Sequence, residues 1–159
     1  MLERRISVVI VDDNVEFTAV VEEFLSRQPD MMVMGAAYNG KAAIGLIEEV
    51  RPDVVVLDVV MPHLDGLGVI DYISAAGFAR RPRIVVVSAI GLETTAASIL
   101  AAGADYYLAK PFDLSVLAER IRRLAAIPPD TRLPERPSMS ARTSSFEFEA
   151  SRALREIGI

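Results

Sequence analysis

Five polar residues in this sequence are of types used in phosphoryl transfer, and each follows or closes a largely apolar run. They are Asp12, Asp13, Asp58, Ser88 and Lys110. Three carboxylates in one place repel one another unless a cation offsets their charge, and all-oxygen ligands suit Mg²⁺, with Mn²⁺ as a second candidate. A lysine ammonium and a serine hydroxyl suit the oxygens of a phosphoryl group held against that metal. If these residues meet in space, the sequence predicts a phosphoryl-transfer site.

The apolar pattern predicts five units, each a strand followed by a helix, which would position these residues. The strands are expected at residues 6–11, 32–37, 54–57, 83–87 and 105–108, and the helices at 15–25, 40–50, 65–76, 92–102 and 113–126. Asn14 is placed to cap the first helix. Regular alternation with short loops predicts an α/β fold: a doubly wound, flavodoxin-like parallel sheet of five strands in the order 2-1-3-4-5 with five flanking helices.

The carboxyl ends of the strands should bring the polar residues together. In a doubly wound sheet those ends open onto one edge, and ligands bind where the strand order reverses. Strands 6–11 and 54–57 are expected to be neighbours, so Asp12 and Asp13 should lie beside Asp58. A carboxylate can itself be the nucleophile, and Asp58 is flanked by the others. We therefore expect an aspartyl phosphate at Asp58, with Asp12 and Asp13 as metal ligands.

Taken singly, these residues have simpler interpretations. Adjacent acids such as Asp12 and Asp13 are more often a helix-capping turn, Lys110 a loop lysine, and Ser88 a cap for the fourth helix or its loop. His63 is expected to be a surface loop residue, because its neighbours supply neither a nucleophile nor a second nitrogen ligand. The prediction of a site depends on the conjunction of all five residues.

The composition excludes several classes of protein. With no cysteine and one histidine, the sequence cannot build a disulfide framework, a thiolate metal site or a multi-histidine site. The mainly apolar N-terminal stretch is short and ends in two carboxylates, unlike a signal peptide or membrane span, so we expect a cytoplasmic protein without a membrane partner. Acids and bases balance in residues 128–159, so all the excess acid lies in residues 1–127, which are not expected to bind nucleic acid.

The domain organisation follows from a change in composition after residue 127. Residues 1–127 form the expected domain, and the proline- and serine-rich residues 128–145 are predicted to be a flexible linker. Residues 146–159 have apolar residues at helical spacing, which predicts one amphipathic helix closed by Gly158. A single such helix cannot be a domain.

Four motifs resemble those of bacterial response-regulator receiver domains: VVIVDDN, DVVVLDVVMPHLDGL, VVVSA and YYLAKPF. The resemblance covers residues 5–127. It implies that Asp58 accepts a phosphoryl group from phosphohistidine on a sensor kinase or histidine phosphotransferase. It also implies that the backbone carbonyl of Val60 joins Asp12, Asp13 and Asp58 as a Mg²⁺ ligand.

The same resemblance implies a conformational switch. Ser88 would turn toward the phosphoryl group and vacate space for Tyr107, and the Lys110–Pro111 peptide bond would be cis. This pair would bias the face formed by the fourth helix, fifth strand and fifth helix, and so drive formation of a homodimer. The protein would be a phosphorylatable switch, not a turnover enzyme.

Slow loss of the phosphoryl group is expected from two apolar positions. Val60 and Ile90 stand two residues after Asp58 and Ser88, where a polar side chain could orient an attacking water.

A narrower set of motifs, AYNG, MPHLDGL, AKPFD and the terminal REIGI, is similar to those of response regulators that initiate sporulation. In these regulators a receiver is linked to a helical DNA-binding effector. The similarity implies a transcriptional output, with residues 146–159 as the opening helix of a truncated effector. DNA would then be bound only through an effector domain missing from this chain.

Two other functions remain open at this point. A haloacid-dehalogenase-like Mg²⁺ phosphatase also combines an aspartate nucleophile with a lysine, but its nucleophile lies in a D-x-D motif after the first strand, where this sequence has Asp12, Asp13 and Asn14. A degenerate receiver could serve only as an interaction module, although all five site residues are present.

Overall fold

The computed structural model describes residues 4–59, 66–89 and 99–128, and its strands form one parallel sheet in the order β2-β1-β3-β4-β5. The strands are β1 (Ile6–Val11), β2 (Met31–Ala37), β3 (Val54–Leu57), β4 (Arg83–Ala89) and β5 (Tyr106–Lys110). This order confirms the predicted doubly wound, flavodoxin-like fold, in which β1 and β3 are neighbours at the point where the strand order reverses.

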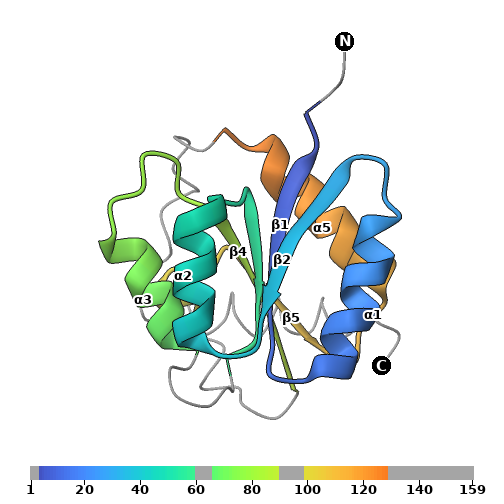
Figure 1. Cartoon of the computed structure of the whole chain (residues 1–159), viewed down its shortest axis with the longest axis horizontal. Coiled ribbons are helices and arrows are strands. Elements are labelled where there is room, and N and C mark those ends of the chain that lie inside the picture. The colour runs from blue at the N-terminus through green and yellow to red at the C-terminus, as the bar shows by residue number, and fades with distance from the viewer. Residues whose placement is uncertain (1–3, 60–65, 90–98, 129–159) are drawn as a thin grey trace, which may run out of the picture.

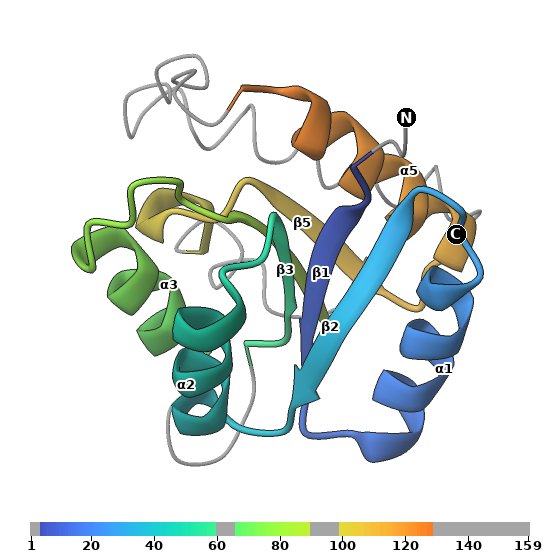
Figure 2. The same ribbon diagram turned by 45° about the horizontal axis from the view of Figure 1, so that its top comes forward.

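Helices cover both faces of the sheet. They are α1 (Val15–Ser26), α2 (Gly40–Val50), α3 (Gly66–Ala75) and α5 (Leu114–Ala126). Residues 99–102 are also helical, at the end of the expected fourth helix. Figure 1 shows α2 and α3 together on one side of the sheet and α1 and α5 on the other, and Figure 2 shows the same layers from a second direction.

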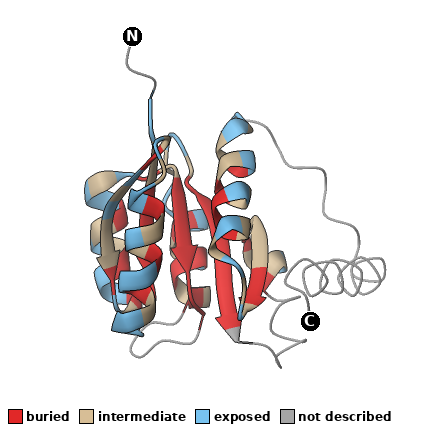
Figure 3. Cartoon of the chain, turned by 90° about the vertical axis from the view of Figure 1, so that its right-hand side faces the viewer, coloured by how far each residue is buried: buried red, intermediate tan, exposed pale blue. Residues whose placement is uncertain are grey.

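Two apolar layers hold these helices to the sheet, because neighbouring residues of each central strand point to opposite faces. Val9 and Val55 pack in the layer under α2 and α3, whereas Val8 and Val54 pack in the layer under α1 and α5. All of β3 and most of β1 are buried, as the red central strands in Figure 3 show. The central strands are therefore fixed from both faces, and so are the residues that follow them.

Side-chain caps start three of the helices. Asn14 Oδ1 accepts a hydrogen bond from the backbone N–H of Phe17 at 3.0 Å, which confirms the predicted cap of α1. Asn39 caps α2 in the same way, and Asp113 caps α5. Such caps satisfy backbone donors that have no partner within the helix. They fix where each helix begins, at the same edge of the sheet as the polar residues.

The strands β4 and β5 are longer than the sequence analysis predicted. Both extend two residues further, with Ser88 paired to Ala109 and Ala89 to Lys110. The predicted strands ended at Val87 and Leu108, but the backbone hydrogen bonds of a sheet do not depend on the type of side chain. Ser88 is therefore a residue of β4 and not a cap of the fourth helix, and Lys110 closes β5 instead of following it. The other predicted ends that fall within the described residues agree with the structure within one residue.

Several predictions fall outside the described residues and stay predictions. They concern Val60, His63 and Ile90, most of the fourth helix, and the linker and amphipathic helix from residue 129 onward. Among the helices that the structure describes, none is long and apolar enough to cross a membrane.

Candidate phosphoacceptor site

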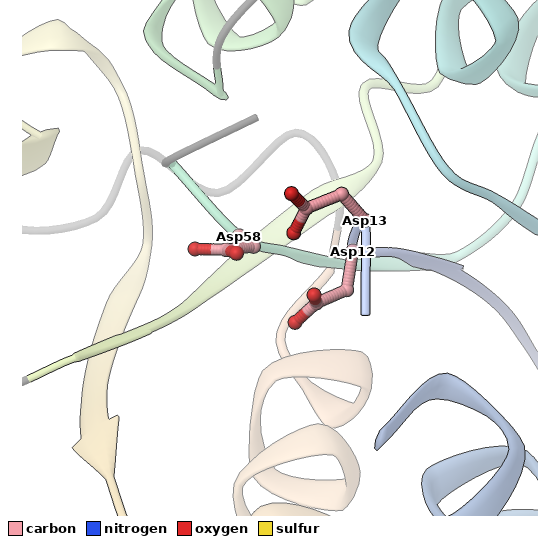
Figure 4. Close-up of side chains that lie close together, drawn as sticks. All are labelled: Asp12, Asp13 and Asp58. Atoms are coloured by element: carbon pink, nitrogen blue, oxygen red, sulfur yellow. The ribbon is translucent and has the colours of Figure 1, made fainter. Parts of the chain in front are cut away.

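Three carboxylates meet where β1 and β3 end. Asp12 and Asp13 follow β1, Asp58 follows β3, and the last residues of these strands, Val11 and Leu57, are paired. One carboxylate oxygen from each aspartate lies within 4.8 Å of the others. Asp12 and Asp58 are buried and Asp13 is exposed, so the cluster opens to solvent on one side. Figure 4 shows the three side chains together.

Backbone hydrogen bonds fix the two buried aspartates just beyond their strands. The Asp12 N–H donates to the Ala37 carbonyl at 3.1 Å, and the Asp58 N–H donates to the Val11 carbonyl at 2.8 Å. Asp12 Oδ1 also accepts from the Asn14 N–H at 2.9 Å. Asp12 thus stabilises the turn into α1, as the simpler interpretation expected, but the cap itself is Asn14. The second carboxylate oxygen of Asp12 takes part in the site.

Lys110 supplies a positive charge to this cluster. Its Nζ atom lies 2.7 Å from Asp12 Oδ2 and 3.9 Å from Asp58 Oδ2. The Lys110–Pro111 peptide bond is cis. Lys110 therefore belongs to the carboxylate cluster, and the interpretation as an ordinary loop lysine does not describe it.

Ser88 carries a buried hydroxyl at the edge of the sheet where the carboxylates meet. Its Oγ atom has no hydrogen-bond partner among the described residues, and the residue is 2% exposed. A buried polar group without a partner costs about 1–3 kcal/mol. β4 lies directly beside β3, so Ser88 lies on the strand next to the one that Asp58 follows. A phosphoryl oxygen at the site would give this hydroxyl an acceptor.

Tyr107 is half-buried on β5 and lies within electrostatic reach of Asp58. It packs against the apolar layer under α2 and α3. Burial raises the pKa of its phenol above the usual value, and the negative charge of Asp58 raises that pKa further. A change of charge at Asp58 should therefore change the pKa of Tyr107.

The donor set fits a hard divalent cation. All three groups are carboxylates, and oxygen ligands suit Mg²⁺ and Mn²⁺. One ammonium against three carboxylates leaves two formal negative charges, which a divalent cation would neutralise. The carbonyl of Val60, the fourth expected ligand, lies outside the described residues.

Two residues that shape the site, Gly66 and Phe17, were not predicted from the sequence. Gly66 begins α3, and a Cβ there would lie 2.5 Å from the carbonyl oxygen of Asp58 and 2.6 Å from Val59 Cα. A glycine in the first turn of the helix predicted at 65–76 was a signal for such a close approach. The ring of Phe17 lies 4.2 Å from Lys110 Nζ. No signal pointed to this contact, because Phe17 also fits the apolar stripe of α1.

Comparison with known proteins gives the family. The model of the response regulator receiver domain matches residues 8–122, and the chain belongs to this family. The structure is similar to the response regulator domain of CheB from Thermotoga maritima, with 30% identity, a TM-score of 0.70 and coverage of 78% of this chain and 98% of that chain.

Two further solved structures are similar. The receiver domain from Bermanella marisrubri is 35% identical, with a TM-score of 0.69 and coverage of 76% of this chain and 98% of that chain. A chain of the CheX-CheY-BeF3-Mg²⁺ complex from Borrelia burgdorferi is 26% identical, with a TM-score of 0.68 and coverage of 78% and 92%. These comparisons do not show the narrower resemblance to sporulation regulators.

Replacing Gly66 tests the close approach of α3 to Asp58. Gly66→Ala should destabilise the fold by about 1–3 kcal/mol and weaken Mg²⁺ binding, because the new methyl group must displace the backbone at Asp58 and Val59. Urea denaturation and a Mg²⁺ titration measure the two effects. Gly45→Ala in α2 is the control: it meets nothing within 4 Å and should add about 0.5–1 kcal/mol of stability. Wild-type stability and Mg²⁺ affinity in Gly66→Ala would contradict this account.

The titration of Tyr107 tests its coupling to Asp58. In Asp58→Asn the pKa of the phenol should fall toward its usual value, because one cause of the raised pKa, the negative charge, is gone. It should remain somewhat raised because burial persists. NMR of ring-labelled tyrosine at rising pH measures the pKa. The matched control is Asp71→Asn, which removes an exposed carboxylate from α3 and should leave the Tyr107 titration unchanged. An equal shift in both variants would refute a specific coupling.

Proposed function

We propose that this receiver domain takes a phosphoryl group on Asp58 from phosphohistidine on a sensor kinase or histidine phosphotransferase. The observation that carries this proposal is the cluster of three carboxylates with Lys110 Nζ 2.7 Å from one and 3.9 Å from another. Membership of the receiver family of two-component systems supports it. The chain would act as a switch that catalyses its own phosphorylation and not the turnover of a substrate.

Each residue would have a defined role in the transfer, and Asp58 would serve both as nucleophile and as metal ligand. An oxygen of Asp58 attacks phosphorus, the bond from phosphorus to the histidine nitrogen breaks, and the imidazole leaves. Lys110 binds an oxygen of the phosphoryl group, and Ser88 donates its hydroxyl hydrogen to another. When bound, Mg²⁺ supplies positive charge that offsets the carboxylates and the phosphoryl oxygens. Asp12, Asp13, Asp58 and the carbonyl of Val60 would hold it, or Mn²⁺ in its place.

The similar CheX-CheY complex from Borrelia burgdorferi contains BeF3 and Mg²⁺. The match with a chain of this complex covers 78% of the present chain. The presence of Mg²⁺ in that complex supports Mg²⁺ as the cofactor of the site proposed here.

The output would pass through Ser88 and Tyr107. A hydrogen bond from Ser88 to the phosphoryl group would move its hydroxyl toward Asp58 and open space for the Tyr107 ring. The unused Ser88 hydroxyl and the dependence of the Tyr107 pKa on Asp58 support such a coupled pair. The ring movement would change the face that β5 and α5 share with the helix ending at residue 102. We propose that two phosphorylated copies associate through this face.

The biological setting is proposed from the narrower motifs. AYNG, MPHLDGL and AKPFD are similar to segments of stage zero sporulation protein A, which supports a phosphorelay that controls transcription at the start of sporulation. DNA would be contacted by an effector domain and not by the acidic receiver, and a cytoplasmic location fits this role. The haloacid-dehalogenase-like alternative finds no support in the comparisons, since the family model matched is that of the receivers.

The intact mass after treatment with acetyl phosphate and Mg²⁺ tests the phosphoacceptor. The wild-type protein should gain one phosphoryl group, and Asp58→Asn should gain none, because the amide cannot act as the nucleophile. Chelation of the metal should prevent the adduct. Asp71→Asn again serves as the matched control and should be labelled like the wild type.

A phosphoryl adduct that persists in Asp58→Asn would refute the assignment. Absence of the adduct in the wild-type protein would favour a degenerate receiver. Steady hydrolysis of a small aryl phosphate would favour a phosphatase.

A further inference from the structure

The aromatic ring of Phe17 is part of the immediate surroundings of the Lys110 ammonium. The ring centroid lies 4.2 Å from Nζ, and Asp12 Oδ2 lies 2.7 Å from the same atom. A cation within about 6 Å of a ring centroid is attracted by the negative charge of the ring face. The ammonium is therefore attracted by the carboxylates and by the ring together.

The ring of Phe17 is itself held in place from two directions. Phe17 lies in the first turn of α1, where its N–H donates to the Asn14 cap at 3.0 Å. Its ring also packs edge to face with Phe112, at 6.1 Å between centroids and 85° between planes. Phe112 lies two residues after Lys110, in the connection from β5 to α5. The ring thus links the start of α1 to the segment that carries the lysine.

Lys110 needs such a constraint more than the aspartates do. The aspartates have short side chains on backbone fixed by the sheet, whereas a lysine ammonium ends a flexible stem of four carbons. The Lys110 side chain is 24% exposed, so orientations toward solvent compete with the one that faces the carboxylates. A fixed ring favours the inward orientation, because it attracts the cation.

We infer that Phe17 is a positioning residue, whose ring holds the Lys110 ammonium where a phosphoryl oxygen would arrive. This inference rests on the proposed function, since it assumes that Lys110 binds the phosphoryl group. The phenyl ring of Phe17 has no oxygen atom and supplies no ligand to the metal. Its loss should therefore weaken binding of the anion and leave binding of the metal largely unchanged.

Binding of Mg²⁺ and of BeF3⁻, measured separately on the whole chain, tests this inference. Tyrosine fluorescence reports the Mg²⁺ affinity, because the sequence has four tyrosines and no tryptophan. Fluorine NMR at saturating Mg²⁺ reports the BeF3⁻ affinity. In Phe17→Leu the BeF3⁻ dissociation constant should rise about three- to thirtyfold, the range that the loss of a cation–π contact implies. The Mg²⁺ dissociation constant should change less than about twofold on the same scale.

Two variants separate positioning from packing. Phe17→Tyr keeps the ring and should keep the BeF3⁻ affinity of the wild type. Tyr106→Leu removes a different cation–π contact of β5, the one with Arg120 at 4.6 Å, and should also bind BeF3⁻ normally. Thermal unfolding verifies that each variant is folded, and Phe17→Met replaces Phe17→Leu if the latter is not.

The outcomes are distinct. Unchanged BeF3⁻ affinity in Phe17→Leu would overturn the inference, and so would a parallel loss of Mg²⁺ and BeF3⁻ affinity, since that pattern indicates a packing defect. Failure of the wild-type protein to bind BeF3⁻ with Mg²⁺ would instead overturn the proposed function on which the inference rests.

Discussion

Repulsion among Asp12, Asp13 and Asp58 is the interaction on which the rest of this structure depends. Carboxylates that lie within 4.8 Å of one another, two of them buried, are unfavourable unless positive charge is placed beside them. Lys110 offsets one of the three charges at 2.7 Å from Asp12. The remaining two match the charge of a divalent cation. The excess negative charge of the cluster therefore favours binding of a divalent cation. Once the cation is bound, the site can also accept an anionic phosphoryl group.

The sheet holds this unfavourable cluster together at its edge. Both faces of β1 and β3 are covered, so the strands cannot separate to relieve the repulsion without exposing two apolar layers. Asp12 and Asp58 come directly after these strands, where each still makes a backbone hydrogen bond of the sheet. Gly66 lets α3 approach the carbonyl of Asp58 more closely than any side chain would permit. The burial of the two apolar layers therefore offsets the repulsion among the carboxylates at the edge of the sheet.

Most of the fold and the core of the site could be predicted from the sequence, because both depend on patterns along the chain. Buried runs such as Val54–Leu57 identify covered parallel strands, and the alternation of strands and helices indicates a doubly wound sheet, for which 2-1-3-4-5 is a common strand order. The predicted ends of β4 and β5 were wrong because hydrogen bonding between the strands continues beyond them to Ala89 and Lys110. The contact of Phe17 with Lys110 joins residues far apart in sequence, and helical periodicity alone assigns Phe17 to the apolar layer.

Chemical trapping of the acyl phosphate tests the central claim most directly. After phosphorylation with acetyl phosphate and Mg²⁺, borohydride reduction converts a phosphorylated aspartate to homoserine, and peptide mass spectrometry locates the changed residue. We expect homoserine at position 58 alone, since Lys110, Asp12 and Asp13 are arranged around Asp58. Homoserine at position 12 or 13, with Asp58 unchanged, would contradict it.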